Sequence, residues 1–288
     1  MNNNSDAILH VLLSYAECDE NIRAVLMEGS RALGNVDKYS DYDIVFVTES
    51  SELYFDGAIM PFLIEKFGEI VVMQTPDNGD PHDVYTHLIQ FANGVRIDLT
   101  FNSIAFLNHT ALESATVVLM DKDNRFFNIS PSSDADFWLK PPSAPEYLSH
   151  CNQFWWCSPY VAKAIIRRQT LHALELLSDC VRREYAWMLL CLAGVRNNWA
   201  KVNPGKHNTN ILGLLSEDDM HYYNTLLNSY VHSNNNEISL TLDNIMAEYN
   251  KLAPMVAELL NFSYNFMEAE KTMQFIKNLH HNETRIKS

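Results

Sequence analysis

"LMEGSRALGNVDKYSDYDIVFV", residues 26–47, is an apolar run that ends at Gly29-Ser30, followed by a second apolar run that opens with Asp41 and Asp43. An ionised carboxylate in a low-dielectric core is costly unless it is paired, so a buried strand rarely contains one without a partner. Residues two apart on a strand point to the same face. We therefore expect Asp41 and Asp43 to project side by side and to share a partner.

The sequence around this stretch alternates between helical and strand patterns over the first ~120 residues. Residues 42–49 are apolar on both faces, which is typical of a central strand covered on both sides. Asn93-Gly94 between two apolar runs predicts a tight hairpin over 85–101. The remaining elements expected here are helices over 6–17 and 55–63 and strands over 23–28, 69–75 and 116–121.

A third carboxylate, Asp98, lies in the second strand of that hairpin, on the same face as Arg96 and Thr100. If this strand is a neighbour of the Asp41–Asp43 strand, three carboxylates converge. They would repel one another, and one would keep its proton unless a cation intervened. Oxygen ligands suit a hard ion such as Mg²⁺, and two such ions activate an attacking oxygen and stabilise a leaving phosphate. The pattern therefore indicates a magnesium site for phosphate chemistry.

The Gly29-Ser30 pair has two interpretations. Taken alone, Gly-Ser is most often a turn, just as a single Asp-x-Asp is most often a solvated strand edge. In the order strand, turn, helix and strand, glycine instead lets the backbone approach a ligand, and the free N–H groups of a following helix bind phosphate. Ser30 adds a hydroxyl donor and Arg31 a positive charge. We favour the phosphate-binding interpretation.

The second half of the chain has a different sequence pattern. Residues 128–147 are rich in Pro, Ser and Asp and are expected to form a connecting loop. Helical periodicity follows and predicts helices over 160–177, 181–193, 218–230 and 241–271. The expected architecture is α+β, with an N-terminal domain over 1–145 built on a mixed β-sheet and a C-terminal helical bundle over 146–288.

Composition narrows the class of partner. The 288 residues carry a net charge of −15, which disfavours nucleic acid and attracts a cationic small molecule. No apolar run reaches the ~20 residues that span a bilayer, and the N-terminus lacks the basic start of a signal peptide. The five cysteines form no CxxC motif and are expected to be reduced thiols. These features indicate a cytoplasmic protein without a membrane partner.

Several segments together resemble one family. "EGSR", "SDYDIVF", "RIDLT", "LMDKD", "FWLKPP", "CNQFWWCSPYVAK" and "REYAWML" are similar to segments of the aminoglycoside 6-adenylyltransferases, the streptomycin adenylyltransferases, and occur in the family order from residue 28 to about 207. This family belongs to the DNA polymerase β-like nucleotidyltransferase superfamily. The resemblance implies a nucleotidyltransferase fold for the first domain and a helical domain that closes the substrate pocket. We expect a monomer or a weak homodimer.

The resemblance further implies a reaction, in which AMP passes from ATP to a hydroxyl of streptomycin and pyrophosphate is released. Asp41 and Asp43 would hold Mg²⁺ against the ATP phosphates, and Gly29-Ser30 would bind the β- and γ-phosphates. Asp98 would be either a further metal ligand or the base that takes the proton of the acceptor hydroxyl.

The resemblance also gives roles to residues that pattern alone leaves open. Lys163, early in a predicted helix, and Lys206, in the "NPGKHN" loop, become candidate phosphate contacts. Trp155 and Trp156 remain either core residues or walls of the drug or adenine pocket.

Other functions remain as alternatives. The acceptor would then be another aminoglycoside, a lincosamide or a protein side chain. The chain could also be a nucleotide-binding regulator without turnover, although the intact set of three aspartates disfavours this.

Overall fold

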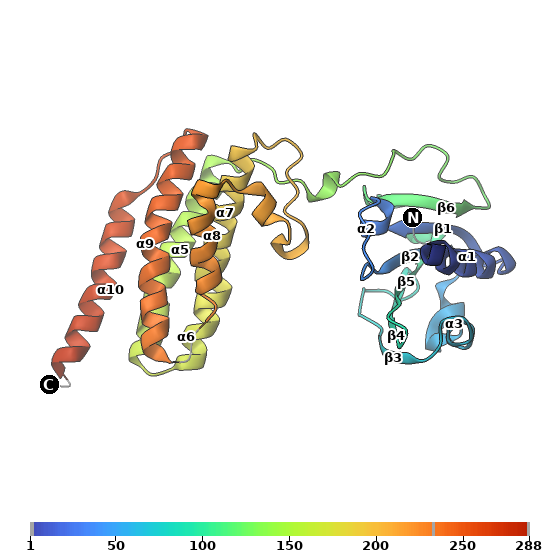
Figure 1. The fold of residues 1–288 in the computed structure, drawn as a ribbon, viewed down its shortest axis with the longest axis horizontal. Helices are drawn as coiled ribbons and strands as arrows, with labels where there is room; N and C mark the ends of the chain where they lie inside the picture. The colour runs from blue at the N-terminus through green and yellow to red at the C-terminus, as the bar shows by residue number, and fades with distance from the viewer. Residues whose placement is uncertain (1–2, 232–233, 287–288) are drawn as a thin grey trace. The chain divides into compact units, whose positions relative to one another are not determined.

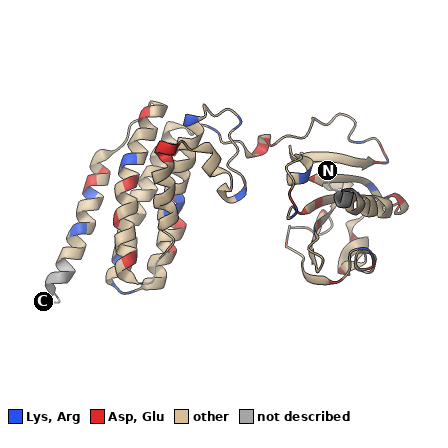
Figure 2. Cartoon of the chain, viewed as in Figure 1, with Lys and Arg blue, Asp and Glu red and all other residues tan. Residues whose placement is uncertain are grey.

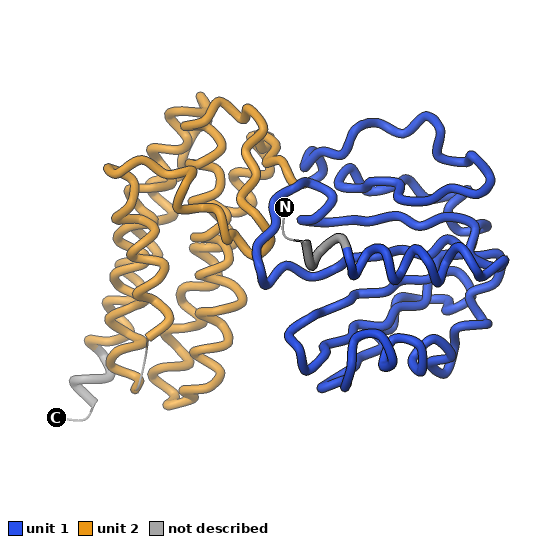
Figure 3. Tube along the Cα trace, turned by 45° about the vertical axis from the view of Figure 1, so that its right-hand side comes forward, with its two compact units in different colours: residues 1–136 blue, residues 137–288 orange. Residues whose placement is uncertain are grey.

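The computed structural model describes residues 3–231 and 234–286 and divides into two compact units, Met1–Asp136 and Phe137–Ser288. Figure 3 colours the two units separately. The division falls before the boundary expected at residue 145. The reason is that Leu139 donates its backbone N–H to the carbonyl of Val202 at 2.8 Å, which ties the segment after Asp136 to the second unit.

The first unit is built on one six-stranded mixed sheet, as expected from the sequence. The strand order is β3-β4-β5-β2-β1-β6, with β2 and β5 parallel and every other neighbouring pair antiparallel. The strands are β1 (Ile22–Glu28), β2 (Tyr42–Thr48), β3 (Ile70–Gln74), β4 (Val84–Phe91), β5 (Arg96–Ser103) and β6 (Thr116–Asp121).

The two faces of the sheet are covered unequally. The helices α1 (Asn3–Cys18) and α3 (Met60–Phe67) cover one face of the sheet (Figure 1), where Leu12, Phe46 and Phe101 are among the buried residues. The opposite face has a smaller core around Leu26 and Val45. It is covered by short elements such as α4 (Ile104–Leu107). β2 is therefore buried on both faces, as its continuous apolar run predicted.

Strand β2 is reached through two tight turns. The one-turn helix α2 (Gly29–Ala32) follows β1, and the chain then enters β2 after an exposed loop over residues 34–39. The predicted hairpin over 85–101 is confirmed, with Gly94 at φ +89° between β4 and β5. A 3₁₀ segment, η1 (Ser51–Gly57), precedes α3, so the helix expected over 55–63 begins and ends later than predicted.

The second unit is a helical bundle around one apolar core. The large buried side chains include Tyr147, Phe154, Trp155 and Tyr249, and the Phe154 and Tyr249 rings stack at 3.6 Å between centroids. The helices are α5 (Ala144–Ile166), α6 (Thr170–Leu176), α7 (Arg183–Arg196), α8 (Met220–Asn228), α9 (Asn235–Leu260) and α10 (Phe266–Ile286). A π-helical segment, η3 (Leu177–Arg182), joins α6 to α7, and the 3₁₀ turns are η2 (Ala135–Phe137), η4 (Lys206–Asn208), η5 (Ile211–Leu214) and η6 (Glu217–Asp219).

Two helix predictions in this unit were wrong. The helix expected over 160–177 is instead the end of α5 followed by α6, because Arg168 adopts a positive φ of 59° between them. The helix α5 already begins at Ala144, where Ser143 and Glu146 form a capping box and Pro145 lies in the first turn, where a proline is tolerated. The helix expected over 241–271 is two helices, since Asn261 adopts a left-handed conformation (φ 57°) and ends α9.

Over the residues that the structure describes, no helix is both long and apolar enough to span a membrane.

Candidate active site

The pairing of β2 with β5 brings the sequence-predicted carboxylates together. The two strands are parallel, and Asp43 lies opposite Asp98 in their register. Opposed residues of neighbouring strands project from the same face of the sheet, so these two side chains are neighbours. Asp41 immediately precedes β2. The site therefore lies at the start of the two parallel strands, on the face away from α1 and α3.

Arg96 is the positive charge within this group. Its guanidinium donates two hydrogen bonds to the Asp98 carboxylate, each 2.9 Å, and its Nε lies 3.4 Å from Asp41 Oδ2. The hydrogen bonds from Arg96 to Asp98, with the nearby charges of Asp41 and Asp43, raise the pKa of the guanidinium above its usual value. The sequence predicted that Arg96 and Asp98 project from the same face of their strand, but it did not predict a function for Arg96.

The Gly29-Ser30 turn lies directly against Asp43. Gly29 has φ +66°, and a Cβ on it would lie 2.6 Å from Asp43 Oδ2. Only glycine permits this approach, because any larger residue would displace the carboxylate and would be strained at that φ. The Gly29 N–H donates to the Ala115 carbonyl at 3.1 Å, which ties the turn to the residue before β6. Ser30 is half-buried in the first turn of α2.

Arg31 stabilises the loop that precedes β2. Its Nε donates to the Asp41 carbonyl and its Nη2 to the Ser40 carbonyl, both at 2.8 Å. Its guanidinium also stacks on the Tyr42 ring, 3.5 Å from the ring centroid. Arg31 thus holds the loop that delivers Asp41 and Asp43 to β2. A phosphate contact by the same side chain remains a prediction.

Glu28 is a carboxylate of this region that sequence reasoning missed. It ends β1 next to Gly29, and burial, followed by the charges of Glu113 and Asp43, raises its pKa to about 7. A single glutamate beside a Gly-Ser turn has no spacing signal that marks it. Its environment arises only when β1, β2 and β6 lie side by side.

The donor set fits a magnesium ion that is shared with a substrate phosphate. Over the described part of the chain, no group of three or more His, Cys, Asp or Glu residues gathers closely enough to hold a metal ion alone. Asp41 and Asp43 still offer hard oxygen ligands next to a glycine turn. Magnesium commonly takes one or two carboxylates and completes its octahedron with waters and phosphate oxygens. These residues fit that mode, whereas a dedicated protein cage is not formed.

Lys163 and Lys206 belong to the second unit. Lys163 lies in α5, with its Nζ 5.5 Å from the Tyr160 ring centroid and 5.6 Å from that of Phe275. It lines a cavity of about 270 Å³ together with Trp156. Lys206 is exposed at the start of η4, directly after Gly205. The phosphate contacts predicted for the two lysines remain predictions.

The neighbouring tryptophans have different environments. Trp155 is buried at 1% exposure, and its Nε1 donates to the Tyr264 hydroxyl at 2.9 Å, so it is a core residue. Trp156 is 61% exposed and lines the cavity beside Lys163. Trp155 is thus the core residue that the sequence allowed, although it also lines this cavity, and a drug- or adenine-binding role for Trp156 remains a prediction.

Comparison with known proteins identifies the family of this site. A family model described as streptomycin adenylyltransferase matches residues 2–279. An aminoglycoside 6-adenylyltransferase of Staphylococcus aureus is 31% identical over 191 residues, covering 63% of this chain and 67% of that protein. Proteins of the same name from Campylobacter jejuni and Bacillus subtilis (strain 168) are 26% and 29% identical, over 93% and 89% of this chain and 93% and 91% of their own lengths.

Among solved structures, the crystal structure of an aminoglycoside 6-adenyltransferase from Bacillus subtilis aligns with 94% of this chain and 97% of its own. The TM-score is 0.46 and the sequence identity 25%. Because the family model spans nearly the whole chain and includes every site residue described above, the protein is a member of the streptomycin adenylyltransferase family of nucleotidyltransferase enzymes.

Proposed function

We propose that this enzyme transfers AMP from ATP to a hydroxyl of streptomycin and releases pyrophosphate, which would inactivate the antibiotic. The observation that carries the proposal is the parallel pairing of β2 and β5, with Asp43 opposite Asp98 and Gly29 packed on the Asp43 carboxylate. The family match and the names of the three relatives support the choice of an aminoglycoside as the acceptor.

The chemistry divides between the carboxylates and the turn. Asp41 and Asp43 would hold a magnesium ion, which would supply neutralisation of the phosphate charge. The acceptor oxygen forms a bond to the α-phosphorus, the bond from that phosphorus to the bridging oxygen of pyrophosphate breaks, and the proton of the acceptor hydroxyl passes to Asp98. This chemistry depends mainly on positioning and charge neutralisation.

Positive groups complete the proposed site. Gly29-Ser30 binds the β- and γ-phosphates, and Lys163 and Lys206 are proposed as further phosphate contacts. Arg96 orients the Asp98 carboxylate through its two hydrogen bonds.

Charge favours the proposed acceptor. The chain has a net charge of −15, and Asp and Glu positions occur on both units in Figure 2. A cationic antibiotic would be attracted to such a surface, whereas a polyanion would be repelled.

The test is incubation of the protein with ATP, Mg²⁺ and a panel of antibiotics, followed by mass spectrometry for AMP addition. The panel holds streptomycin, other aminoglycosides and a lincosamide. We expect an AMP adduct on streptomycin and stoichiometric pyrophosphate. If only the lincosamide or another aminoglycoside is modified, that compound and not streptomycin is the acceptor. If no compound in the panel gains AMP, the proposed activity is contradicted.

Asp43→Asn provides the matched negative control. The amide keeps the shape of the side chain and removes the charge, so turnover should fall to background while the protein stays folded. Folding is checked by circular dichroism and thermal melting. An Asp43→Asn protein with wild-type turnover would place the reaction elsewhere in the molecule.

A further inference from the structure

Arg96 contacts two carboxylates of the candidate active site, and the two contacts differ. Its Nε and Nη2 donate to the two oxygens of Asp98, each at 2.9 Å, which makes a bidentate pair. Its Nε also lies 3.4 Å from Asp41 Oδ2, a longer ion-pair contact. The shorter, two-fold contact shows that the guanidinium is paired primarily with Asp98.

Burial strengthens the pair of Arg96 with Asp98. The side chain of Asp98 is 18% exposed, against 33% for Asp41, and charges that are less exposed to water are screened less. The hydrogen bond to Asp98 is also the largest cause of the raised pKa of the Arg96 guanidinium. Because the two residues lie two positions apart on β5, the strand holds their side chains on one face.

The three aspartates of the site do not gather into one group of ligands. Within residues 3–231 and 234–286, no three His, Cys, Asp or Glu side chains lie close enough together to hold a metal ion. The strand positions alone would allow such a group, since Asp43 and Asp98 are opposite each other in the register of β2 and β5. The Asp43 carboxylate instead lies against Gly29, whereas that of Asp98 is bonded to Arg96. The contacts of the side chains therefore separate the two carboxylates.

The charge of Arg96 disfavours a second cation on Asp98. A guanidinium paired with a carboxylate is close to neutral as a unit, so the pair adds little attraction for a metal ion. To coordinate an ion, Asp98 would have to give up at least one of its bonds to Arg96. Removing one partner of a largely buried ion pair is costly. The ion is therefore attracted mainly by Asp41 and Asp43.

We propose that Arg96 is a positioning residue that keeps Asp98 from binding the metal ion and so reserves this carboxylate for the acceptor hydroxyl. This inference rests on the proposed function and adds a division of roles to it. Asp41 and Asp43 would hold the ion, whereas Asp98 would serve only the acceptor. Without Arg96, Asp98 would become a third negative ligand.

The test measures the binding of Mn²⁺ to the full-length protein without nucleotide, with electron paramagnetic resonance to quantify the free ion. The variants are Arg96→Gln and the double change Arg96→Gln with Asp98→Asn. Arg23→Gln is the matched control. Arg23 also donates to an aspartate, Asp123, through two nitrogens, but it lies near the start of β1, at the opposite end of that strand from Gly29.

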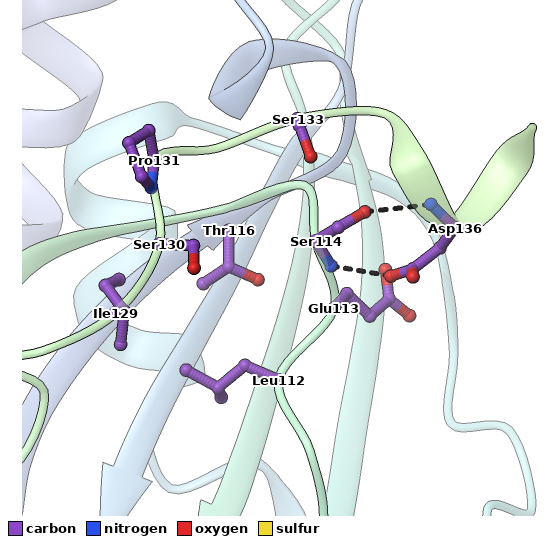
Figure 4. A pocket seen from close by; sticks show the side chains of 9 residues that line it. All are labelled: Leu112, Glu113, Ser114, Thr116, Ile129, Ser130, Pro131, Ser133 and Asp136. Atoms are coloured by element: carbon purple, nitrogen blue, oxygen red, sulfur yellow. Dashed lines mark hydrogen bonds between the residues drawn. The ribbon is translucent and has the colours of Figure 1, made fainter. Parts of the chain in front are cut away.

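Ion binding at other carboxylates has to be separated from this signal. Glu113 and Asp136, for example, line a cavity of about 400 Å³ beside the start of β6, which Figure 4 shows. Mn²⁺ that binds there would add to the titration. Asp43→Asn weakens the proposed ion site and leaves the lining of this cavity unchanged, so the binding that remains in Asp43→Asn is subtracted from every titration.

We expect Arg96→Gln to lower the Kd of Mn²⁺ on the order of tenfold, because it removes a positive charge near the ion and releases Asp98. The double variant should return to within about threefold of the wild-type Kd, because it removes a pair that is neutral as a unit. Arg23→Gln should keep the wild-type Kd. Damage to the fold would weaken ion binding, so tighter binding is a result that a merely structural role of Arg96 does not produce.

Three results would overturn the inference. Unchanged or weaker binding in Arg96→Gln would mean that Arg96 does not keep Asp98 from the ion. Much weaker binding in the double variant than in the wild type would mean that Asp98 is itself a ligand. A wild type that binds no more Mn²⁺ than Asp43→Asn would remove the ion site altogether.

The measurement stays decisive if one variant is unstable, and it is independent of the antibiotic assay. Should Arg96→Gln fail to fold, the double variant decides the question, because it removes both members of the ion pair. If the ion titrations agree with expectation but no antibiotic gains AMP, the proposed function fails on its own. If streptomycin is modified but Arg96→Gln does not bind Mn²⁺ more tightly, only the role of Arg96 is rejected.

Discussion

At the scale of single residues, Asp98 is the one whose role in the reaction can be separated by experiment. It accepts two hydrogen bonds from Arg96 and lies opposite Asp43. If Asp98 is the general base, Asp98→Asn should lower kcat by about 10²–10⁴-fold and leave the Kd of Mg·ATP unchanged. Turnover assays together with nucleotide titration check this.

The alternative outcome has a clear signature. Should Asp98 act mainly as a metal ligand, the Asn variant would bind Mg·ATP more weakly and lose turnover as well. A variant with wild-type values of both would show that the carboxylate on β5 is not part of the reaction.

Glu28 gives a pH-dependent stability. Its pKa is about 7 in the folded protein, chiefly because of burial, against an ordinary value of 4.5. A raised carboxyl pKa stabilises the fold below the unfolded pKa, and that stabilisation is lost as pH rises through the folded pKa. Relative to Glu28→Gln, the metal-free protein should therefore lose on the order of 2 kcal/mol of unfolding free energy between about pH 5 and about pH 8. Urea denaturation of both proteins across this range is the measurement, and parallel pH profiles would contradict the assignment.

At the scale of elements, the one-turn helix α2 depends on a glycine. Gly29→Ala puts a Cβ 2.6 Å from Asp43 Oδ2 and a non-glycine residue at φ +66°. Such strain costs about 1–3 kcal/mol, and the displaced carboxylate should lose most of the turnover. Thermal melting and the AMP-transfer assay check both effects.

Gly34 supplies the control for this prediction. It has φ +75°, but a Cβ on it would meet no atom within 4 Å. Gly34→Ala should therefore show a comparable loss of stability and keep its activity. Equal loss of activity in the two variants would mean that backbone strain, and not the contact with Asp43, explains the effect.

The helices show how far local patterns predict an element. The start of α5 was readable as Ser-x-x-Glu at Ser143 and Glu146, yet the surrounding prolines indicated a loop. The break after α9 comes from Asn261, a residue type that tolerates the left-handed conformation without requiring it. Hydrophobic periodicity therefore located the helical region, whereas the cap at Ser143 and the left-handed Asn261 set where α5 starts and α9 ends.

At the scale of the whole molecule, the proposed reaction requires a hard divalent ion. The site residues offer oxygen ligands only, so Mg²⁺ or Mn²⁺ should support turnover and Zn²⁺ should not. We expect exhaustive chelation to abolish pyrophosphate release and added Mg²⁺ to restore it. Full pyrophosphate release after chelation, with metal analysis verifying that the ion is gone, would contradict the assignment of a magnesium site.

The same chelated protein separates binding from chemistry. Because Asp41 and Asp43 would contact ATP through the ion, the Kd of ATP should rise on chelation and recover with Mg²⁺. Binding that is indifferent to the ion would mean that the two carboxylates do not face the nucleotide phosphates.

The sequence by itself determined the strands, the hairpin at Asn93-Gly94 and the faces on which Asp43 and Asp98 project, because side-chain direction along a strand has a strict period of two. It did not determine that these carboxylates are neighbours. The parallel pairing of β2 and β5, the ion pairs of Arg96 and the raised pKa of Glu28 were decided by the tertiary structure. Each of these features depends on which strands, distant in the sequence, lie side by side in the sheet. Burial and electrostatic interactions between such strands cannot be predicted from a local sequence pattern.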